Sequence, residues 1–203
     1  MNYQNSQNSQ NYHFFAYLSR MKLIDRWSLM RTAIPENVQE HSLQVAIIAH
    51  GLVVIGNTYY DTKENPAEVA LLAVFHDAGE VITGDLPTPV KYYDPKIKDA
   101  YGNIENTAKQ KLLSLLPAEL TDSYEKLFFP PHDRGYELVK AADKISAYVK
   151  CLEELMAGNG EFARAAESVK KQAEKYFYLP EVKRFMEEYV ESFRLTLDEI
   201  SLS

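Results

Sequence analysis

The residues of this chain with the clearest chemical potential are two histidines and two aspartates, His41, His76, Asp77 and Asp143. Imidazole nitrogen and carboxylate oxygen together suit a hard or borderline divalent cation. His76 and Asp77 are adjacent, and neighbouring donors can both reach one ion where a helix end is distorted. His41 and Asp143 are distant in sequence, so helix packing must bring their faces together. The four residues predict a site for one divalent cation.

A His-Asp pair alone is weak evidence, because chance produces such pairs and the chain contains a second one, His132-Asp133. The first pair continues as HDAGE, which places Glu80 about one helical turn further on, before a Gly/Pro-rich loop. The second pair follows the sequence FFPP, which cannot be helical, and has no partner of metal-binding type nearby. We therefore expect a site at His76-Asp77 and a surface loop at the second pair.

Each candidate ligand also has an ordinary structural interpretation. A lone histidine on an apolar stripe, such as His41, is more often a hydrogen-bonded core residue than a ligand. A lone aspartate in the position of Asp143 is harder to explain in this way, because burying an unpaired carboxylate costs several kcal/mol. Four such donors on buried faces favour a shared cation over four independent accidents.

The elements that position these residues are expected to be helices. Apolar residues recur at helical rather than alternating spacing, and the breaks carry Pro, Gly, Asn or Asp, so the predicted fold class is all-α. Asn37 should cap a helix that runs to the stop at Gly56-Asn57. One stripe of this helix carries Val38, His41, Val45, Ile48, Leu52 and Ile55.

A next helix should begin at Asn65-Pro66 and end near Gly79, and an irregular loop should cover residues 83–89. Before these, a first helix through Leu18 should end ahead of Arg26. Further helices are expected over residues 98–116, 118–128, 136–157, 160–178 and 181–193. In the 136–157 helix, one stripe combines Val139, Ala142, Asp143, Ser146 and Val149.

Length and composition favour one soluble domain. The chain has 203 residues, 46% hydrophobic and 25% charged, and no segment approaches the ~18 consecutive apolar residues of a membrane span. Residues 1–10 are expected to form a mobile polar tail and residues 11–203 the domain. The start lacks the features of a secretory signal, and the single Cys151 agrees with a reducing compartment, so we expect a cytoplasmic protein with no membrane partner.

The net charge of −7 argues against a broad phosphate-tracking surface, so duplex nucleic acid is not an expected partner. A small phosphorylated substrate remains compatible with this charge. One cation and one or two basic side chains can reverse the local sign of the potential.

Three stretches, VQEHSLQVA, LLAVFHDAGEVITGDLPTPVKYY and VKAADKISAYVKCLEELMAGN, resemble the HD-domain superfamily, whose pattern is H…HD…D. The chain is more closely similar to the bacterial 5′-deoxynucleotidases of the YfbR type. The similarity includes HFFAYLSRMKLIDRW and the terminal TLDEIS, so it covers nearly the whole chain after the polar tail. TGDLPTPVKY after HDxxE, with Arg26-Trp27 upstream, is distinctive of this branch. The departures are the longer N-terminus, Gly79 and Lys144.

The resemblance implies a single-domain helical bundle that hydrolyses deoxynucleoside 5′-monophosphates to nucleoside and phosphate, and it implies a homodimer. The matching metal ligands are His41, His76, Asp77 and Asp143, for one Co, Mn, Zn, Fe or Cu ion. Arg26 matches a phosphate-contacting residue, and Glu80 and Asp85 match catalytic acids whose division into general acid and base stays open. The positions that match the substrate-binding region are Arg26, Trp27, His41, Asp85, Leu86, Pro87, Thr88 and Asp143.

Other interpretations remain at this point. Arg26 could be a surface ion-pair residue, and Trp27 could be an ordinary packing residue. Other HD enzymes hydrolyse deoxynucleoside triphosphates, cyclic nucleotides or guanosine tetraphosphate. The absence of a GYP signature, of paired histidines for a second metal and of a basic surface weighs against them. A non-catalytic nucleotide-binding HD module is disfavoured because it has no chemical need for the complete set of site residues.

Overall fold

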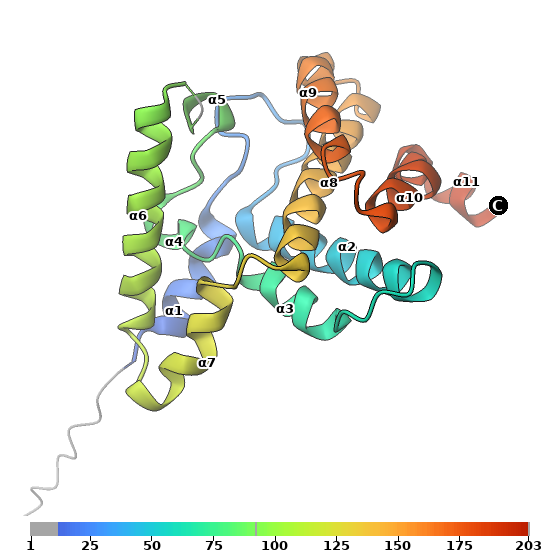
Figure 1. Ribbon diagram of the computed structural model, residues 1–203. Coiled ribbons are helices and arrows are strands. Elements are labelled where there is room, and N and C mark those ends of the chain that lie inside the picture. Colours follow the sequence, from blue (N-terminus) through green and yellow to red (C-terminus); the bar gives the residue numbers. More distant parts are fainter. Residues whose placement is uncertain (1–11, 92, 203) are drawn as a thin grey trace, which may run out of the picture.

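The computed structural model describes residues 12–91 and 93–202, and within these ranges the regular elements are helices, with no β-strand (Figure 1). The expected all-α fold is confirmed. The polar tail expected over residues 1–10 lies outside the described residues, and the domain limits 11–203 stay a prediction.

The helices follow one another with short connections. In chain order they are α1 (Phe14–Leu18), α2 (Val38–Tyr59), α3 (Pro66–Phe75), α4 (Glu80–Thr83), α5 (Thr88–Lys91), α6 (Pro95–Leu113), α7 (Ala118–Phe128), α8 (Arg134–Met156), α9 (Ala163–Glu174), α10 (Pro180–Glu188) and α11 (Leu197–Leu202). Three 3-10 segments, Ser19–Leu23, Gly160–Phe162 and Val190–Arg194, extend or precede α1, α9 and α10.

Helix α2 carries the centre of the fold. The Asn37 side chain accepts hydrogen bonds from the backbone N–H groups of Gln39 and Glu40, which caps the helix as expected. All six residues of the predicted stripe are buried. Helix α2 packs mainly on α3 and α8, so the stripe is the main contact surface of the core. Each fully buried Val, Leu or Ile contributes roughly 1.5–3 kcal/mol.

The stop predicted at Gly56-Asn57 is wrong, because α2 continues to Tyr59. Instead, Gly56 lets two other side chains come close to α2: a Cβ at this position would lie 2.7 Å from Oγ1 of Thr62 and 3.3 Å from Oε1 of Glu181. The missing side chain therefore makes room for neighbouring elements while the residue stays helical.

By length and hydropathy, α2 is the one helix of the described residues that could cross a membrane: an 18-residue window within it has a mean hydropathy of 1.3. Half of this window is buried inside the protein. The helix also packs against α3, α8 and α10, which is the environment of a core helix.

Helix α3 begins at the predicted Asn65 cap but ends at Phe75, four residues before the expected Gly79. The following residues form turns, in which the His76 N–H donates to Ala73 O and the Ala78 N–H to Phe75 O. These bonds span three residues instead of four, so the α-helical ladder is lost at the HDAG segment. The helix end is therefore distorted at the predicted ligands.

The loop expected over residues 83–89 is shorter than predicted. Thr83 ends α4, and Thr88 begins α5, which leaves residues 84–87 irregular. Gly84 has φ 73°, a conformation that suits glycine. Pro89 lies in the first turn of α5, where its missing N–H costs nothing, so a proline does not exclude a helix here.

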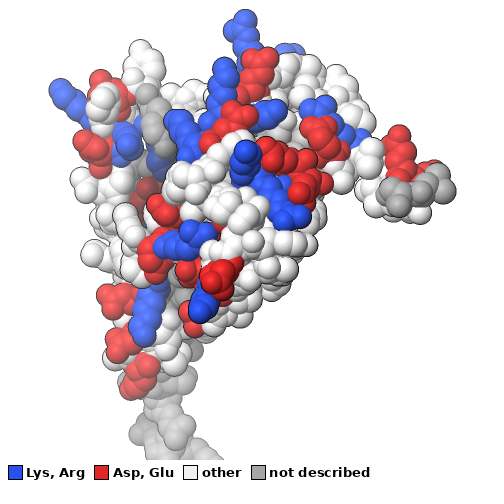
Figure 2. Space-filling model, turned by 45° about the vertical axis from the view of Figure 1, so that its right-hand side comes forward, with Lys and Arg blue, Asp and Glu red and all other residues white. Residues whose placement is uncertain are grey.

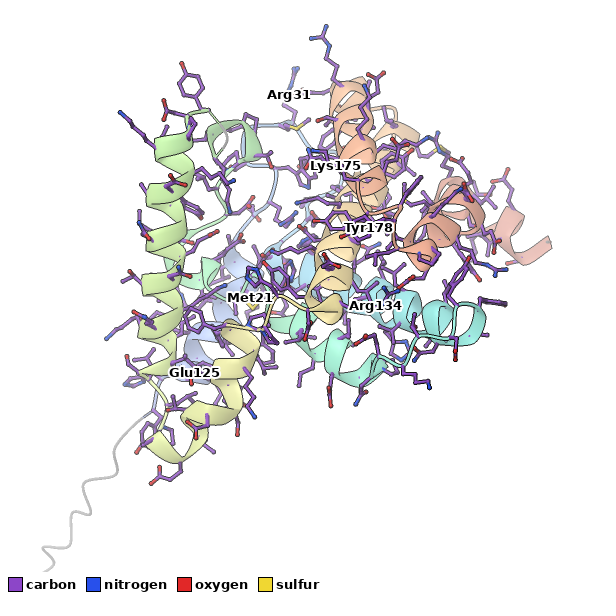
Figure 3. All side chains as sticks on the ribbon, in the orientation of Figure 1. Met21, Arg31, Glu125, Arg134, Lys175 and Tyr178 are labelled. Atoms are coloured by element: carbon purple, nitrogen blue, oxygen red, sulfur yellow. The ribbon has the colours of Figure 1, made fainter. Side chains whose placement is uncertain are left out.

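The C-terminal third also departs from the prediction. Helix α9 ends at Glu174 instead of 178, α10 gives way to a 3-10 segment, and α11 was not expected. A main core lies between α2, α3, α8, α9 and α10, and a smaller cluster joins α1, α6 and α7. Arg134, at the start of α8 (Figure 3), pairs with the buried Glu181 of α10.

Charged side chains of both signs alternate over the face shown in Figure 2, without a broad basic region. The view covers one side of the protein.

Buried Glu154 of α8 ties the segment before α2 to the core. Its carboxylate accepts hydrogen bonds from Ala33 N (2.8 Å), Ile34 N (3.0 Å), Lys150 Nζ (2.6 Å) and Asn159 Nδ2 (2.7 Å). Burial alone would raise the pKa of Glu154, but the bonds from Lys150 and the Ala33 N–H outweigh it and lower the pKa to about 2. The ionised form is therefore the one that the fold stabilises.

Glu154→Gln should lower the free energy of unfolding at pH 7 by about 3 kcal/mol or more, because Lys150 loses its buried counter-charge. A depressed carboxyl pKa contributes stability above its ordinary value and loses it as pH falls toward about 2, so the difference from wild type should shrink on acidification. Urea unfolding at pH 7 and pH 3 measures this, with the exposed Glu167→Gln as control. Equal stability of the two variants at pH 7 would contradict the role of Glu154.

Candidate metal centre and active site

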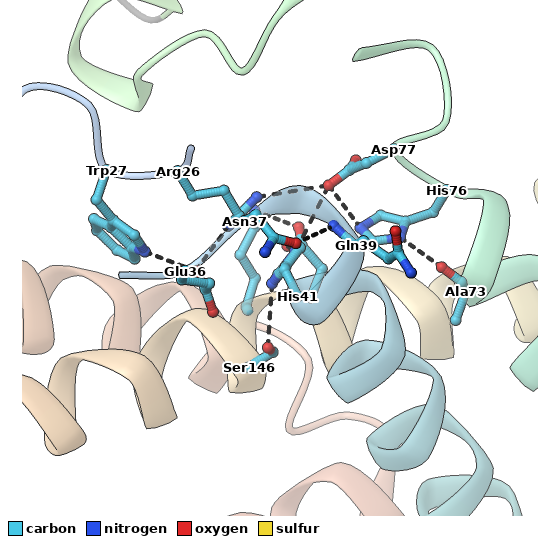
Figure 4. A network of polar contacts seen from close by, with 12 residues as sticks. Arg26, Trp27, Glu36, Asn37, Gln39, His41, Ala73, His76, Asp77 and Ser146 are labelled. Atoms are coloured by element: carbon cyan, nitrogen blue, oxygen red, sulfur yellow. Dashed lines mark hydrogen bonds and ion pairs between the residues drawn. The ribbon is translucent and has the colours of Figure 1, made fainter. Parts of the chain in front are cut away.

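The fold brings the four predicted donors together, and Figure 4 shows His41, His76 and Asp77 side by side. His41 comes from α2, His76 and Asp77 from the turn after α3, and Asp143 from α8. One ligand atom each of His41, His76 and Asp143 lies within 4.8 Å of the other two. Asp77 Oδ2 joins them at 3.0 Å from His76 Nε2 and 3.7 Å from His41 Nε2.

The ring of His76 is oriented so that its Nε2 can act as a metal ligand in this cluster. Its Nδ1 lies 2.6 Å from Ala73 O, and because a carbonyl only accepts, Nδ1 carries the proton. In the neutral ring, Nε2 then carries the lone pair. This atom is buried and has no hydrogen-bond partner, although the Asp77 carboxylate is close. A backbone carbonyl on one nitrogen and a free second nitrogen is the usual arrangement of a metal-binding histidine.

His41 is fully buried and faces the same point. Its Nδ1 lies 3.2 Å from Ser146 Oγ, and its Nε2 lies 3.2 Å from Asp143 Oδ1. Burial and the positive charge of Arg26 lower the pKa of His41 despite the nearby carboxylates. The ring is therefore held neutral, which is the form that binds metals.

Both carboxylates of the cluster are held ionised. Burial opposes ionisation, but His76 outweighs it at Asp77, and Lys144 with His41 outweighs it at Asp143, so both pKa values lie below their ordinary range. Two ionised carboxylates and two imidazole rings thus converge on one point. Such a donor set fits a hard or borderline divalent cation, the class that the sequence predicted.

Arg26 and Trp27 are held together by Glu36, a residue that the sequence did not single out. A single oxygen of Glu36, Oε2, accepts from Arg26 Nε (3.0 Å) and from Trp27 Nε1 (2.9 Å), as Figure 4 shows. Arg26 Nη1 also lies 3.6 Å from Asp77 Oδ2. The negative charges of Asp77 and Glu36 overcome the effect of burial and raise the pKa of Arg26.

Trp27 has an uncommon backbone conformation. Its φ is 60°, in the left-handed region that a bulky residue rarely adopts. The backbone bonds from Arg26 N to Glu36 O and from Met30 N to Trp27 O close the turn around it. The indole packs on Phe162 at 5.3 Å between ring centroids, so Trp27 is partly a packing residue. Strain of this kind persists where the surroundings enforce it, often at ligand sites.

Two cavities meet at the donor cluster. An apolar cavity of about 350 Å³ includes Trp27, Pro87 and, from α9, Val169. A polar cavity of about 310 Å³ includes His76, Asp77, Glu80 and several lysines. The residues that line both are Arg26, Asp85, Thr88, Asp143 and Lys144. The predicted Leu86 lines the polar cavity, so every residue of the predicted site lies at the cluster or its cavities; the buried His41 belongs to the cluster but lines neither cavity.

Glu80 and Asp85 occupy different places. Glu80 lines only the polar cavity, and its buried Oε2 has no hydrogen-bond partner. Burial and the negative charges of Asp77 and Asp85 raise the pKa of Glu80 to about 10. Asp85 lies at the junction of the two cavities, where burial and Asp77 raise its pKa against the effect of Arg26.

Several site residues were missed from the sequence. Lys140 was detectable in principle, because it precedes Asp143 by three residues and so lies on the same helix face. Lys91, Lys109 and Glu36 carried no such signal, since only the fold brings them to the site.

The remaining residues considered from the sequence lie outside the site. His132 is exposed and stacks on Tyr136, while Asp133 caps α8, so the second His-Asp pair is a surface feature as expected. His50 is also exposed. Cys151 is buried in the core as a small apolar residue.

Comparisons with known proteins agree with this architecture. The family profile described as YfbR-like 5′-deoxynucleotidase matches residues 13–193. A 5′-deoxynucleotidase of Photobacterium profundum is 53% identical over 194 residues, covering 93% of this chain and 98% of that protein. A 5′-deoxynucleotidase of Cronobacter sakazakii is 52% identical over 191 residues, covering 93% and 96%.

Solved structures share the fold. An HD-domain phosphohydrolase of Listeria innocua superposes with a TM-score of 0.81 at 21% identity, covering 93% of this chain and 92% of that one. The HD phosphohydrolase of cyanophage S-2L, solved with dA and one catalytic Zn²⁺ ion, gives a TM-score of 0.66 at 20% identity, with 87% and 96% covered. From its profile match and its close relatives, this chain belongs to the YfbR-like 5′-deoxynucleotidase family.

Proposed function

We propose that this protein hydrolyses deoxynucleoside 5′-monophosphates to deoxynucleoside and orthophosphate with one divalent metal ion. The observation that carries the proposal is the convergence of four metal-type donors at the junction of an apolar and a polar cavity. A nucleoside suits the apolar cavity, and a phosphate group suits the junction beside Arg26. Relatives at 53% and 52% identity are named 5′-deoxynucleotidases, which supports the same substrate class here.

The metal is a divalent first-row ion such as Co, Mn, Zn, Fe or Cu, held by His41, His76, Asp77 and Asp143. When bound, such an ion polarises a phosphoryl oxygen and lowers the pKa of water. The catalytic Zn²⁺ of the cyanophage phosphohydrolase supports zinc as one candidate. Arg26, already placed beside Asp77, stabilises the charge that grows on the phosphoryl oxygens.

The places of Glu80 and Asp85 support a division of their roles. In an in-line displacement the water oxygen bonds to phosphorus on the side opposite the leaving 5′ oxygen. With the nucleoside in the apolar cavity, the water lies on the polar side, where Glu80 can orient it and accept its proton. Asp85 lies at the junction and can donate a proton to the 5′ oxygen as its bond to phosphorus breaks. The raised pKa of Asp85 favours the protonated form that this donation needs.

Hydrolysis of other nucleotides and simple nucleotide binding remain the competing functions. A non-catalytic module would not require an unpartnered, buried Glu80 carboxylate beside the donor cluster. The homodimer, the cytoplasmic location and the absence of membrane and duplex nucleic acid partners stay predictions.

Sugar discrimination should depend on Trp27. The indole lines the apolar cavity together with Arg26 and Pro87, so an added 2′-hydroxyl would clash or lack a hydrogen-bond partner there. Such a penalty separates deoxy from ribo substrates by roughly 10 to 200-fold. Trp27→Ala should lower the ratio of kcat/KM for dAMP to kcat/KM for AMP. Arg26→Ala should lower kcat/KM for both nucleotides by the same factor.

The ratio is measured on folded, metal-loaded protein. Phe162→Leu is the matched control, because it disturbs the packing of Trp27 without removing the indole. An unchanged ratio in Trp27→Ala, together with a loss of stability, would mean that Trp27 only packs.

A further inference from the structure

The polar cavity contains cations that the proposed chemistry does not use. Its basic residues are Arg26, Lys91, Lys109, Lys140 and Lys144, and its acidic residues are Asp77, Glu80, Asp85, Glu105 and Asp143. Asp77 and Asp143 belong to the donor cluster. Arg26 and Lys144 lie beside these two carboxylates, so three lysines and three acids remain, and one of these lysines, Lys91, pairs with Glu105.

Lys109 and Lys140 are distinguished from the other bases by their contacts. Lys91 pairs with Glu105 at 2.8 Å, and Lys144 with Asp143 at 2.8 Å. Within the part of the chain that the structure describes, neither Lys109 nor Lys140 forms an ion pair; their ammonium groups lie 5.8 Å from the Phe129 ring and 5.4 Å from the Tyr136 ring. Both side chains are half-buried, so their charges are only partly hydrated.

The two lysines approach the cavity from different helices. Lys109 lies on α6 and Lys140 on α8, with α4 between these helices in Figure 1. The Lys109 stem packs on the turn before Glu80, since a Cβ at Gly79 would lie 3.4 Å from Lys109 Cγ. Burial and the positive charge of Lys140 lower the pKa of Lys109, whereas Asp143 and the other negative charges nearby outweigh burial and raise the pKa of Lys140. Lys140 is therefore held charged and repels the ammonium group of Lys109. A bound anion would relieve this repulsion.

Their place separates them from the reacting phosphoryl group. Arg26 and Asp85 line both cavities and so mark the junction, whereas Lys109 and Lys140 line only the polar cavity. In an in-line displacement the phosphoryl group moves away from the leaving nucleoside. That direction leads from the junction into the polar cavity, toward the lysines.

We propose that Lys109 and Lys140 form an anion subsite beyond the reacting phosphoryl group, which takes orthophosphate. That this phosphate is the reaction product rests on the proposed function; the binding of the anion does not. Phosphate in this subsite would compete with forward turnover, so orthophosphate should act as an inhibitor.

Two measurements on the metal-loaded full chain test the subsite. Calorimetric titration with inorganic phosphate alone gives its Kd, and dAMP hydrolysis with added phosphate gives KM and the inhibition constant. Lys109→Gln and Lys140→Gln should each raise the Kd about tenfold or more, and should raise the inhibition constant far more than KM. Lys111→Gln, an exposed lysine of α6 with the same charge change, should leave all three constants unchanged.

Unchanged phosphate binding in both variants would overturn the subsite. Equal increases in KM and in the inhibition constant would also overturn it, because the lysines would then bind the phosphoryl group of the substrate itself. Lys140→Arg should keep phosphate binding, which separates loss of charge from loss of packing. If wild type binds phosphate through these lysines but hydrolyses no deoxynucleotide, the proposed function fails and the subsite stands. If it hydrolyses dAMP while both variants bind phosphate normally, only the subsite fails.

Discussion

Asp143→Asn should abolish phosphate release from dAMP to about one thousandth of the wild-type rate or less, while the helical fold survives. The carboxylate lies 3.2 Å from His41 Nε2, and its charge is part of the donor set. An amide is a weak metal ligand without charge, so the cation should be lost, and a bound metal supplies several kcal/mol of transition-state stabilisation. Elemental analysis and circular dichroism check the metal content and the fold.

Asp133→Asn is the matched control, because it makes the same chemical change at the start of the same helix. Asp133 caps α8 through Tyr136 N, and asparagine caps as well as aspartate. This variant should keep both metal and activity. Full metal occupancy in folded Asp143→Asn would remove Asp143 from the site.

Glu80→Gln should keep the metal and the substrate but lose turnover by about 100 to 10,000-fold, the usual contribution of a positioned acid or base. Burial, Asp77 and Asp85 raise the pKa of Glu80 to about 10. A cation beside Asp77 would oppose this rise and favour the ionised form of Glu80, which can accept a proton. Single-turnover kinetics measure the chemical step directly.

Metal content and dAMP binding provide the controls for Glu80→Gln. Both should match wild type, because Glu80 lines only the polar cavity and is not one of the clustered donors. A near-normal turnover number would contradict the proton-transfer role.

Helix-level features could be predicted from the sequence where periodicity and capping agree. The Asn37 and Asn65 caps and the buried stripe of α2 are confirmed, because local hydrogen bonds and apolar spacing determine them. The end of α3 was misplaced by four residues. The sequence placed His76 on that helix, but it lies in the turn after α3, where Ala73 O and the Asp77 carboxylate orient its ring.

The site was predictable as a set of residues but not as an arrangement. His41 and Asp143 could be identified because they are polar residues on apolar helix faces, and burying a polar group that has no partner costs free energy. Glu36 and Lys109 could not be found in this way. They reach the site through tertiary packing, and their own sequence surroundings carry no periodic or motif signal.

Phosphate release from dAMP by purified wild-type protein tests the central claim most directly. The protein is stripped with a chelator, and separate aliquots are reloaded with Zn²⁺, Mn²⁺ or Co²⁺ before deoxyadenosine and orthophosphate are quantified. We predict equimolar deoxyadenosine and orthophosphate from at least one reloaded sample and no release from the stripped one. Equal release from stripped and reloaded protein, or none from any folded, metal-loaded sample, would contradict a metal-dependent 5′-deoxynucleotidase.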